Sequence, residues 1–397
     1  MSKKRRDSKN RVLRSGESQR KDGRYAYKYI DTFGNPQFVY AWKLVPTDKT
    51  PAGKREDISL REKEKEIQKD LDDGIDTIGK KMTVCQLYAK QIRHRGNVRY
   101  NTKNGRKRLM KLLEEDKLGG CPIDSVKLSD AKEWAIRMKE KGISYKTISN
   151  DKRSLKAAFY TAIQDDCIRK NPFDFQLNTV IEDDTEPKVP LTPAQEESFL
   201  SFAQNDKVYQ KYYDELIILL GTGLRISELC GLTDTDINFE NRIINVDHQL
   251  LRSAETGYYI ETPKTKSGIR QIPMSEKVYE AFNRVLKRRR GAKAVTIDGY
   301  SNFLFLNRDG YPKTATNYDG MFRGLAKKYN KYHEEALPKV MTPHTLRHTF
   351  CTNMANAGMN PKALQYIMGH SNITMTLNYY AHATFDSAKA EMLRIAA

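Results

Sequence analysis

Five residues whose side chains handle phosphate occur in a fixed order along the chain. His344 and Arg347 lie in TPHTLRH, His370 ends QYIMGH, and Tyr379 follows nine positions later in TMTLNYYAH. Arg225 lies far upstream in GTGLRISEL. Two guanidinium groups can hold phosphate oxygens, two imidazoles can donate or move protons, and a phenol can act as a nucleophile. Gathered in one place, these groups could break a phosphodiester bond without a metal ion.

Local signals predict short helices that would position these groups. Thr342 followed by Pro343 is a strong helix start, which puts His344 and Arg347 on one face near a helix N-terminus, an end that attracts anions. The run NPKALQYIMG predicts a second short helix, with an Asn cap, an opening Pro and a closing Gly, that ends just before His370. The segment TMTLNYYAH can form a third short helix that presents a tyrosine.

Two further positions complete the set of candidates. The glycines of GTGLRISEL would let the chain turn sharply before a helix, and Glu228 could orient Arg225. Lys266 lies in TPKTKSGIRQIP at an expected hairpin tip, from which it could reach into a cleft. Lys264 has nearly the same claim, and the place directly before the Ser-Gly turn favours Lys266. Taken singly, each of these residues also fits an ordinary structural role.

The length and the changing composition predict several domains. At 397 residues the chain is too long for one ordinary hydrophobic core. Residues 1–78 combine a basic tail, two aromatic runs around a TFGNP turn and a charged helical run, which predicts a small ββα module. Residues 79–174 hold four amphipathic helical patterns, 175–190 a polar, acidic linker, and 191–397 mixed helices and short strands. We expect a multidomain, mainly α fold with small antiparallel β-sheets.

Charge and cysteine usage narrow the class of partner. The chain has 69 Lys and Arg against 50 Asp and Glu, and this net charge of +19 favours a polyanion, most simply nucleic acid. No apolar stretch reaches the length of a membrane span, and no secretory signal opens the sequence. The five cysteines form no C-x-x-C pair, so we expect reduced thiols in a cytoplasmic protein, with neither zinc nor disulfides. No clustered Asp and Glu ligands accompany the basic set, which disfavours a metal nuclease.

The combination is more specific than its parts. The order Arg, Lys, His-x-x-Arg, Gly-His, Tyr resembles the tyrosine recombinase (phage integrase) family over roughly residues 185–397. The helical bundle resembles the family's core-site DNA-binding domain, and the basic N-terminal module resembles the arm-binding domain of longer integrases. At this level the chain is similar to integrases of conjugative transposons. The spacing from His370 favours Tyr379 as the family's tyrosine, while Tyr380 would fit the Tyr-x-His pattern that the family often shows.

The resemblance implies a mechanism. The tyrosine attacks a DNA backbone phosphate, the arginines stabilise the charged transition state, the histidines donate or move protons, and the lysine protonates the departing 5′-oxygen. The product is a 3′-phosphotyrosyl link, which a 5′-hydroxyl can attack to rejoin DNA without ATP, metal or cofactor. The catalytic set implied is Arg225, Lys266, His344, Arg347, His370 and Tyr379.

Partners follow from the same resemblance. Cutting two duplexes takes four active sites, so a homotetramer on double-stranded DNA is implied, acting on element ends, a circular intermediate and target sites in the bacterial cytoplasm. Accessory excision and DNA-bending proteins could assist. The amphipathic tail TFDSAKAEMLRIAA could dock on a neighbouring subunit or on its own domain. A type IB topoisomerase and a non-catalytic DNA-binding regulator are the alternatives; the N-terminal extension and His344 favour the recombinase.

Overall fold

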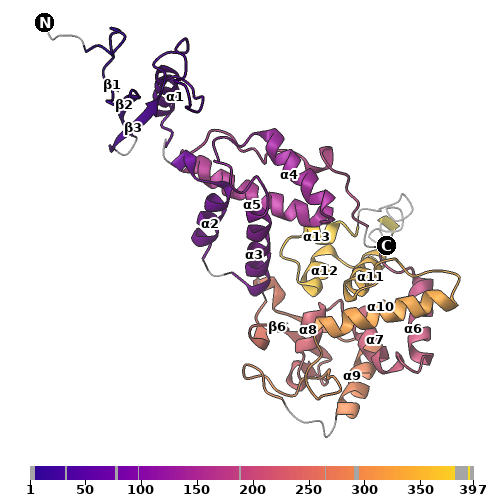
Figure 1. Ribbon diagram of the computed structural model, residues 1–397. Coiled ribbons are helices and arrows are strands. Elements are labelled where there is room, and N and C mark those ends of the chain that lie inside the picture. Colours follow the sequence, from indigo (N-terminus) through magenta and orange to yellow (C-terminus); the bar gives the residue numbers. More distant parts are fainter. Residues whose placement is uncertain are drawn as a thin grey trace. The chain divides into compact units, whose positions relative to one another are not determined.

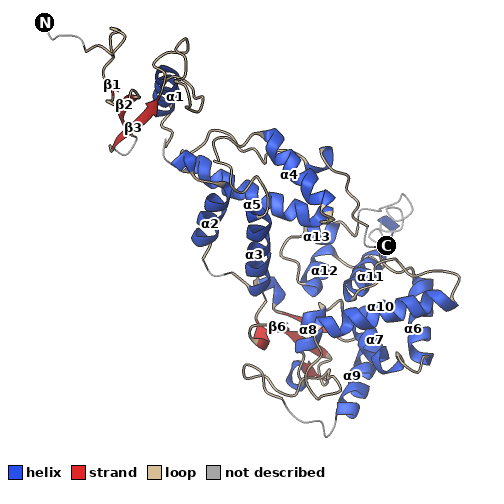
Figure 2. Cartoon of the chain, in the orientation of Figure 1, coloured by secondary structure: helices blue, strands red, loops and turns tan. Residues whose placement is uncertain are grey.

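The structure is a computed structural model that describes residues 5–31, 34–76, 79–96, 98–186, 189–263, 265–289, 295–380 and 392–393. The chain divides into two compact units, Met1–Thr185 and Glu186–Ala397. Helices dominate, and the sheets are small and antiparallel (Figure 2), which confirms the predicted fold class. The finer division at residues 78, 174 and 190 stays a prediction. Within the described ranges, no helix has the length and apolar character needed to cross a bilayer.

The N-terminal part of the first unit is a small sheet covered by a helix. Strands β1 (Glu17–Gln19), β2 (Tyr25–Ile30) and β3 (Pro36–Ala41) pair antiparallel in that order, and helix α1 is Leu60–Asp72. Tyr25, Ala41, Leu44 and Leu60 form the buried core between sheet and helix. The expected hairpin and charged helix are both present.

The rest of the first unit is a helical bundle, as its apolar spacing predicted. Its helices are η1 (Gly79–Lys81), α2 (Val84–His94), α3 (Tyr100–Glu114), α4 (Leu128–Glu140), α5 (Tyr145–Gln164) and η2 (Leu177–Thr179). Fully buried Trp134 and Phe159 pack against Phe173, with the Trp134 and Phe173 ring centroids 5.7 Å apart. This core is separate from that of the N-terminal sheet.

The second unit is a helical domain with two small sheets (Figure 1). Its helices are α6 (Pro193–Asn205), η3 (Gln210–Tyr212), α7 (Tyr213–Thr222), α8 (Ile226–Gly231), η4 (Asp234–Asp236), η5 (Lys266–Gly268), α9 (Glu276–Arg289), α10 (Ala315–Tyr332), α11 (Pro343–Asn356), α12 (Pro361–Met368) and α13 (Thr374–Leu377). One sheet has the order β4 (Ile237–Asn238), β5 (Ile243–Val246), β8 (Arg270–Pro273), and the other pairs β6 (Gln249–Ser253) with β7 (Gly257–Glu261).

The expected hairpin around Lys266 is wrong. Strand β7 pairs with β6, whereas β8 pairs with β5 in the other sheet. The segment between β7 and β8 therefore crosses from one sheet to the other, and Lys266–Gly268 forms a short 3-10 turn within it. Strands β7 and β8 are neighbours in the sequence, but each pairs with another strand, so adjacency in sequence did not decide the pairing.

Helix α7 organises the second unit, because it packs against both α9 and α11. Its leucine- and isoleucine-rich sequence is buried on most sides, with Leu216 and Leu219 fully inaccessible. Gly221 lies inside this helix, and a Cβ there would come within 2.4 Å of Val278 on α9. Of the two glycines expected to turn the chain, Gly223 alone does so, with a positive φ of 63° that closes the helix.

A pair of buried carboxyl groups lies in the N-terminal module. Glu17 is fully buried and accepts hydrogen bonds from Arg61 Nε at 2.8 Å and from the backbone N–H of Arg14 at 2.7 Å. Glu64 is 8% exposed, and its buried Oε1 has no partner among the described residues. Burial, followed by the negative charge of Glu17, raises the pKa of Glu64 to about 7.

This raised pKa makes the module's stability depend on pH. The folded state binds the Glu64 proton more tightly than the unfolded state, so the stabilisation is complete below the ordinary pKa of 4.5 and is lost as pH rises through about 7. We expect Glu64→Gln to stabilise the module at pH 8 by roughly 1–3 kcal/mol and to change little at acidic pH. Hydrogen exchange of the β2 and α1 amides in the full chain measures this. A Glu64→Gln effect that is equal at both pH values would contradict the assignment.

Candidate active site

Arg225 is fixed at the start of α8 by a carboxylate one turn away. Its backbone N–H donates to Glu228 Oε2 at 2.8 Å, and its guanidinium donates to Glu228 Oε1 at 2.6 Å. A second nitrogen of the guanidinium donates to the carbonyl of Gly369 at 3.0 Å. The predicted orientation of Arg225 by Glu228 is thus present, and it ties α8 to the end of α12.

Glu228 is shared with a second arginine that the sequence analysis missed. Arg270 is 3% exposed and donates to both oxygens of Glu228, at 3.0 and 2.9 Å. Burial opposes ionisation of Glu228, but the hydrogen bonds and charge of Arg270, followed by the charges of Arg225 and Arg347, lower its pKa to about 2. The signal that could have revealed Arg270 was a cation at an inward position of the alternating strand RQIP, beside inward-facing Ile272.

Arg347 comes from the first turns of α11, where Thr342 is the N-cap and Pro343 opens the helix as predicted. Its side chain is buried and donates to the carbonyls of Gly223, at 2.5 Å, and Met368. Among the described residues no carboxylate forms an ion pair with it. Burial, and then the neighbouring charge of Arg225, lower the pKa of Arg347 to about 9. A buried cation whose hydrogen bonds go to neutral carbonyls keeps a positive charge that can attract an anion.

The C-terminal end of α12 holds all three arginines. Its last carbonyls accept from Arg270 (Ile367, 2.6 Å), from Arg347 (Met368) and from Arg225 (Gly369, 3.0 Å). These carbonyls have no partner within the helix, and the helix dipole makes this end negative. Guanidinium groups therefore satisfy the end of α12, and α12 in turn sets where they point.

His370 follows Gly369, whose φ of 61° ends α12 in the left-handed conformation predicted for it. The imidazole is 6% exposed, and its Nδ1 lies 2.9 Å from the hydroxyl of Thr376 on α13. Burial, then the charges of Arg347 and Arg225, lower the pKa of His370 to about 4. The ring is therefore neutral near pH 7 before any anion binds.

Two histidines lie one turn apart on α11, and the second of them lies close to Tyr379. The rings of His344 and His348 have centroids 5.6 Å apart, and the centroid of the His348 ring is 5.0 Å from that of Tyr379. His344 was predicted as a site residue, and His348 was not, although both stand in TPHTLRH. Their four-residue spacing, which places side chains on one helical face, was the available signal.

The neighbouring tyrosines have different surroundings. Tyr379 lines a cavity of about 640 Å³ together with Arg225, His344, Arg347 and His370. The Tyr380 hydroxyl instead donates to the carbonyl of Met359 at 2.5 Å. Burial, followed by nearby Cys351, raises the pKa of Tyr379 to about 12, while the charge of Arg347 acts in the opposite direction. This geometry favours Tyr379 as the nucleophile, because a phosphate in the cavity would lie next to its side chain.

Lys266 is the predicted site residue that the structure does not bring to this cavity. It is exposed in η5 and is not among the lining residues. Its neighbour Ser267 nevertheless comes close to the end of α12, because a Cβ on Gly369 would lie 3.0 Å from the Ser267 carbonyl oxygen. The turn that carries Lys266 therefore borders the turn that carries His370. Lys264 and the tail TFDSAKAEMLRIAA, apart from Met392 and Leu393, lie outside the described residues.

One group of acidic and histidine side chains has the spacing of metal ligands within the described ranges. Ligand atoms of Asp236, Asp247 and His248 lie within 4.8 Å of one another. Both ring nitrogens of His248 already have partners, Asp247 at 2.5 Å and the carbonyl of Gly231 at 2.8 Å. The imidazole also packs on the ring of Tyr300. We assign His248 a structural role at the entry to β6, outside the cavity of Tyr379.

Substitution of the buried carboxylate Glu228 tests this charge arrangement. Glu228→Gln leaves Arg270 buried without its counter-charge, so we expect the second unit to lose about 3 kcal/mol of stability. Thermal unfolding measures the loss. Glu228→Gln combined with Arg270→Met should lose less, because the cation is removed with its partner. The control Glu280→Gln breaks an exposed 3.6 Å pair with Arg284 and should cost under about 1 kcal/mol. Equal melting of Glu228→Gln and Glu280→Gln would refute the argument.

Comparison with known proteins identifies the family. The model of the phage integrase family matches residues 190–387, and that of the DNA binding domain of Tn916 integrase matches residues 1–71. The chain is 70% identical over 395 residues to the transposase from transposon Tn1545 of Streptococcus agalactiae serotype V, and 69% identical to that from Tn916 of Enterococcus faecalis. Each alignment covers 100% of this chain and 97% of the relative.

A solved structure agrees with these relatives. The Tn1549 transposon integrase, residues 82–397 in complex with a circular intermediate DNA, is 78% identical, with a TM-score of 0.76. The match covers 79% of this chain and 99% of that one. The chain therefore belongs to the phage integrase family of tyrosine recombinases.

Proposed function

We propose that this chain is the integrase of a conjugative transposon, which cuts and rejoins DNA at the ends of its element. Membership of the tyrosine recombinase family gives the reaction class. The transposases of Tn1545 and Tn916 match the chain from end to end, and the Tn1549 integrase has been solved with transposon right end DNA and with circular intermediate DNA. The observation that carries the proposal is the cavity in which Tyr379 meets Arg347, a buried cation without a carboxylate partner among the described residues.

The reaction begins with binding of one DNA phosphate between the arginines. Arg225 and Arg347 take its non-bridging oxygens and stabilise the additional negative charge of the five-coordinate transition state. The Tyr379 oxygen attacks phosphorus, the bond to the 5′-oxygen breaks, and a 3′-phosphotyrosyl ester forms. The solved Tn1549 integrase carries R225K in one DNA complex and Y379F in another.

Two proton transfers accompany this step. The phenol must lose its proton, and with a pKa of about 12 it cannot do so unaided near pH 7. The neutral imidazole of His370 and the exposed imidazole of His344, which line the same cavity, are the groups that accept or relay this proton. The departing 5′-oxygen gains a proton from Lys266, whose turn borders that of His370. Lys264 is the alternative donor.

Rejoining reverses the chemistry. The phosphotyrosyl ester keeps the energy of the broken bond, so a 5′-hydroxyl from another strand can attack it and release Tyr379. On this basis the enzyme needs neither ATP nor a metal ion. Exchange between two duplexes takes four such sites, which implies a homotetramer on DNA, with accessory proteins that bend DNA or promote excision. A type IB topoisomerase would relax DNA with similar groups but would not exchange strands between two labelled duplexes.

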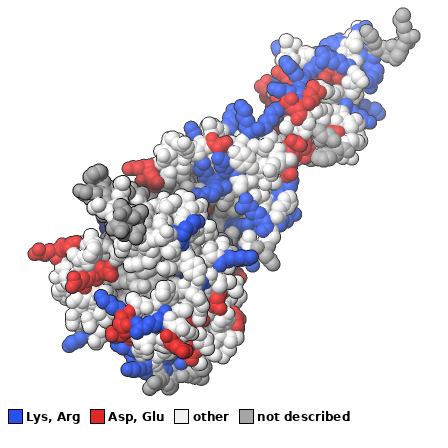
Figure 3. All heavy atoms as spheres, turned by 180° about the vertical axis from the view of Figure 1, so that it is seen from behind, with Lys and Arg blue, Asp and Glu red and all other residues white. Residues whose placement is uncertain are grey.

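The charge of the surface suits a long DNA partner. On the face seen in Figure 3, Lys and Arg side chains occur over both units and are interrupted by Asp and Glu. Residues 1–185 hold 42 Lys and Arg against 28 Asp and Glu, and residues 186–397 hold 27 against 22, so both units are net positive and most of the +19 lies in the first unit. Such a distribution fits sequence-independent contacts with the phosphate backbone.

The nucleophile can be tested by covalent trapping. A suicide DNA substrate is nicked near the cleavage site, so that the short fragment with the 5′-hydroxyl diffuses away and cannot rejoin. With this substrate, the wild-type protein should form an SDS-resistant adduct in EDTA. Tyr379→Phe should abolish this adduct, because no oxygen remains to attack, whereas Tyr380→Phe should retain it, because that hydroxyl is bound to the Met359 carbonyl. Loss of the adduct in Tyr380→Phe alone would transfer the role to Tyr380. A requirement for added metal would disprove metal independence.

The lysine can be tested by changing the leaving group. Lys266→Ala should slow cleavage of an ordinary substrate by about 10²–10⁴-fold. A substrate with sulfur in place of the 5′-bridging oxygen releases a thiolate, whose conjugate acid has a pKa of about 8.5, so it needs no general acid. Lys266→Ala should therefore cleave this substrate at close to the wild-type rate. Lys264→Ala is the matched control. If the sulfur substrate restores cleavage in Lys264→Ala alone, Lys264 and not Lys266 donates the proton to the departing 5′-oxygen.

A further inference from the structure

A second cavity lies at the other end of α7 from Arg225. It has a volume of about 740 Å³ and is lined by residues of η3, the start of α7, the end of α9 and the segment 304–317. The ten residues of α7 span about 15 Å, and none of the residues that line this cavity lines the cavity of Tyr379. The two cavities thus share no lining residue, and the second lies at the N-terminal end of α7.

The cavity presents hydrogen-bond donors that lack an acceptor. The side chains of Lys211 and Arg308 are exposed, and within the described ranges neither has a hydrogen bond or ion pair. The Tyr212 hydroxyl likewise has no hydrogen bond to any described residue. Asn317 uses its carbonyl oxygen to accept from Thr314 at 2.8 Å, which leaves its amide NH₂ group for a ligand. Ammonium, guanidinium, phenol and amide groups are the side chains that contact phosphate oxygens in protein–DNA complexes.

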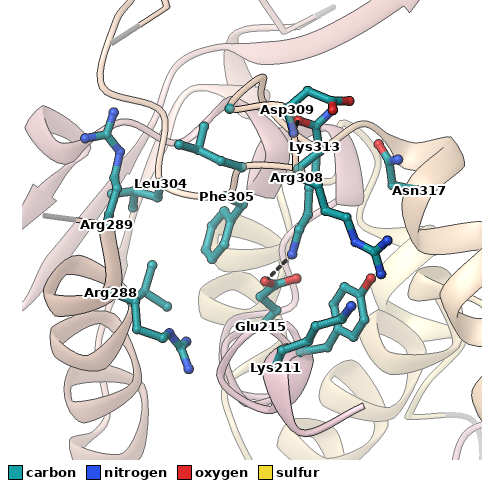
Figure 4. Close-up of a pocket in the computed structure, with 15 residues that line it drawn as sticks. Lys211, Glu215, Arg288, Arg289, Leu304, Phe305, Arg308, Asp309, Lys313 and Asn317 are labelled. Atoms are coloured by element: carbon teal, nitrogen blue, oxygen red, sulfur yellow. Dashed lines mark hydrogen bonds and ion pairs between the residues drawn. The ribbon is translucent and has the colours of Figure 1, made fainter. Parts of the chain in front are cut away.

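Two lysines of the cavity lie against one aromatic ring. The Nζ atoms of Lys211 and Lys313 lie 5.1 and 4.5 Å from the centroid of the Tyr212 ring. Figure 4 shows Arg308 and Lys313 extending from their loop toward Glu215 and Lys211, so that their charged ends share one region of the cavity. Lys313 is held there by an ion pair of 2.5 Å with Glu215, which is 5% exposed.

The other charged residues of the cavity are already engaged or lie apart. Arg288 pairs with buried Asp214 at 2.6 Å, and Arg289 donates to the carbonyl of Phe303. Asp309 is an exposed carboxylate on the same loop. In Figure 4 the two α9 arginines stand on the opposite side from Arg308 and Lys313. The available positive charge is therefore that of Lys211 and Arg308, with Lys313 fixed beside them.

We propose that this cavity binds a phosphate group through Lys211, Tyr212, Arg308 and Asn317. Lys211 and Arg308 form no ion pair with any described residue. Two such cations, supplemented by two neutral donors, match the several oxygens of a phosphate better than the two oxygens of a carboxylate. The phosphate belongs either to DNA that passes outside the catalytic cavity or to a free phosphorylated ligand. The first source rests on the proposed function, and the second does not.

The experiment compares two double variants of equal charge. Lys211→Gln with Arg308→Gln removes both cations of the cavity, and Lys207→Gln with Arg323→Gln removes two exposed cations outside it, one before η3 and one on α10. The first measurement is the affinity of the full chain for duplex DNA over a series of KCl concentrations. The second is thermal unfolding without DNA, in pyrophosphate against KCl of equal ionic strength. Suicide-substrate cleavage by the wild type tests the proposed function separately.

The outcomes separate the sources. If the phosphate is part of DNA, the slope of log affinity against log salt should lose about one unit in the cavity variant and should be unchanged in the control. If the ligand is free, pyrophosphate should raise the melting temperature of the wild type and the control by more than that of the cavity variant, in which only the cavity of Tyr379 is left to bind it. The proposal is overturned if the two variants behave alike in both measurements. It is also overturned if a polyglutamate peptide, and not pyrophosphate, stabilises the wild type, since the cavity would then bind an acidic protein segment.

Discussion

The arrangement of the candidate active site depends on an imbalance of buried charge around Glu228. This one carboxylate binds Arg225 and Arg270, while Arg347 nearby is held by the carbonyls of Gly223 and Met368. Burying a cation without a counter-ion is unfavourable, and the lowered pKa of Arg347 expresses that cost. On the proposed function, an anionic substrate would supply the missing charge at this position. A second carboxylate in this position would stabilise the protein and would compete with phosphate.

Helix ends rather than loops build this arrangement. The C-terminal carbonyls of α12 accept from three arginines that come from α8, β8 and α11, and the end of α7 contributes the carbonyl of Gly223. The helix fixes the direction of the carbonyls at its terminus, and the hydrogen bonds to these carbonyls therefore fix the positions of the guanidinium groups. Gly223 and Gly369 are left-handed at these two ends, which exposes the carbonyls while the chain continues at once into Arg225 and His370.

The sequence predicted what local rules encode. The Thr-Pro start of α11, the Asn cap of α12 and its closing Gly369 each act within a few residues, and they placed His344, Arg347 and His370 correctly in their elements. Contacts between distant segments were less accessible. Arg270 meets Glu228 from 42 residues away, and β7 and β8 choose partners in different sheets. Strand pairing and buried ion pairs depend on the whole fold, so Arg270 and the true setting of Lys266 became visible in the structure alone.

The protonation states explain why such a site can rest without reacting. With a pKa of about 12 for Tyr379 and about 4 for His370, the phenol keeps its proton and the imidazole cannot take it. The excess positive charge and the burial that keep His370 neutral are both altered when a phosphate enters. An anion there would offset the charges of Arg225 and Arg347, which would raise the pKa of His370 and make it a better proton acceptor. On the proposed mechanism, substrate binding thus supplies the one charge that the buried cluster lacks, and the same event prepares the imidazole to accept the proton of Tyr379.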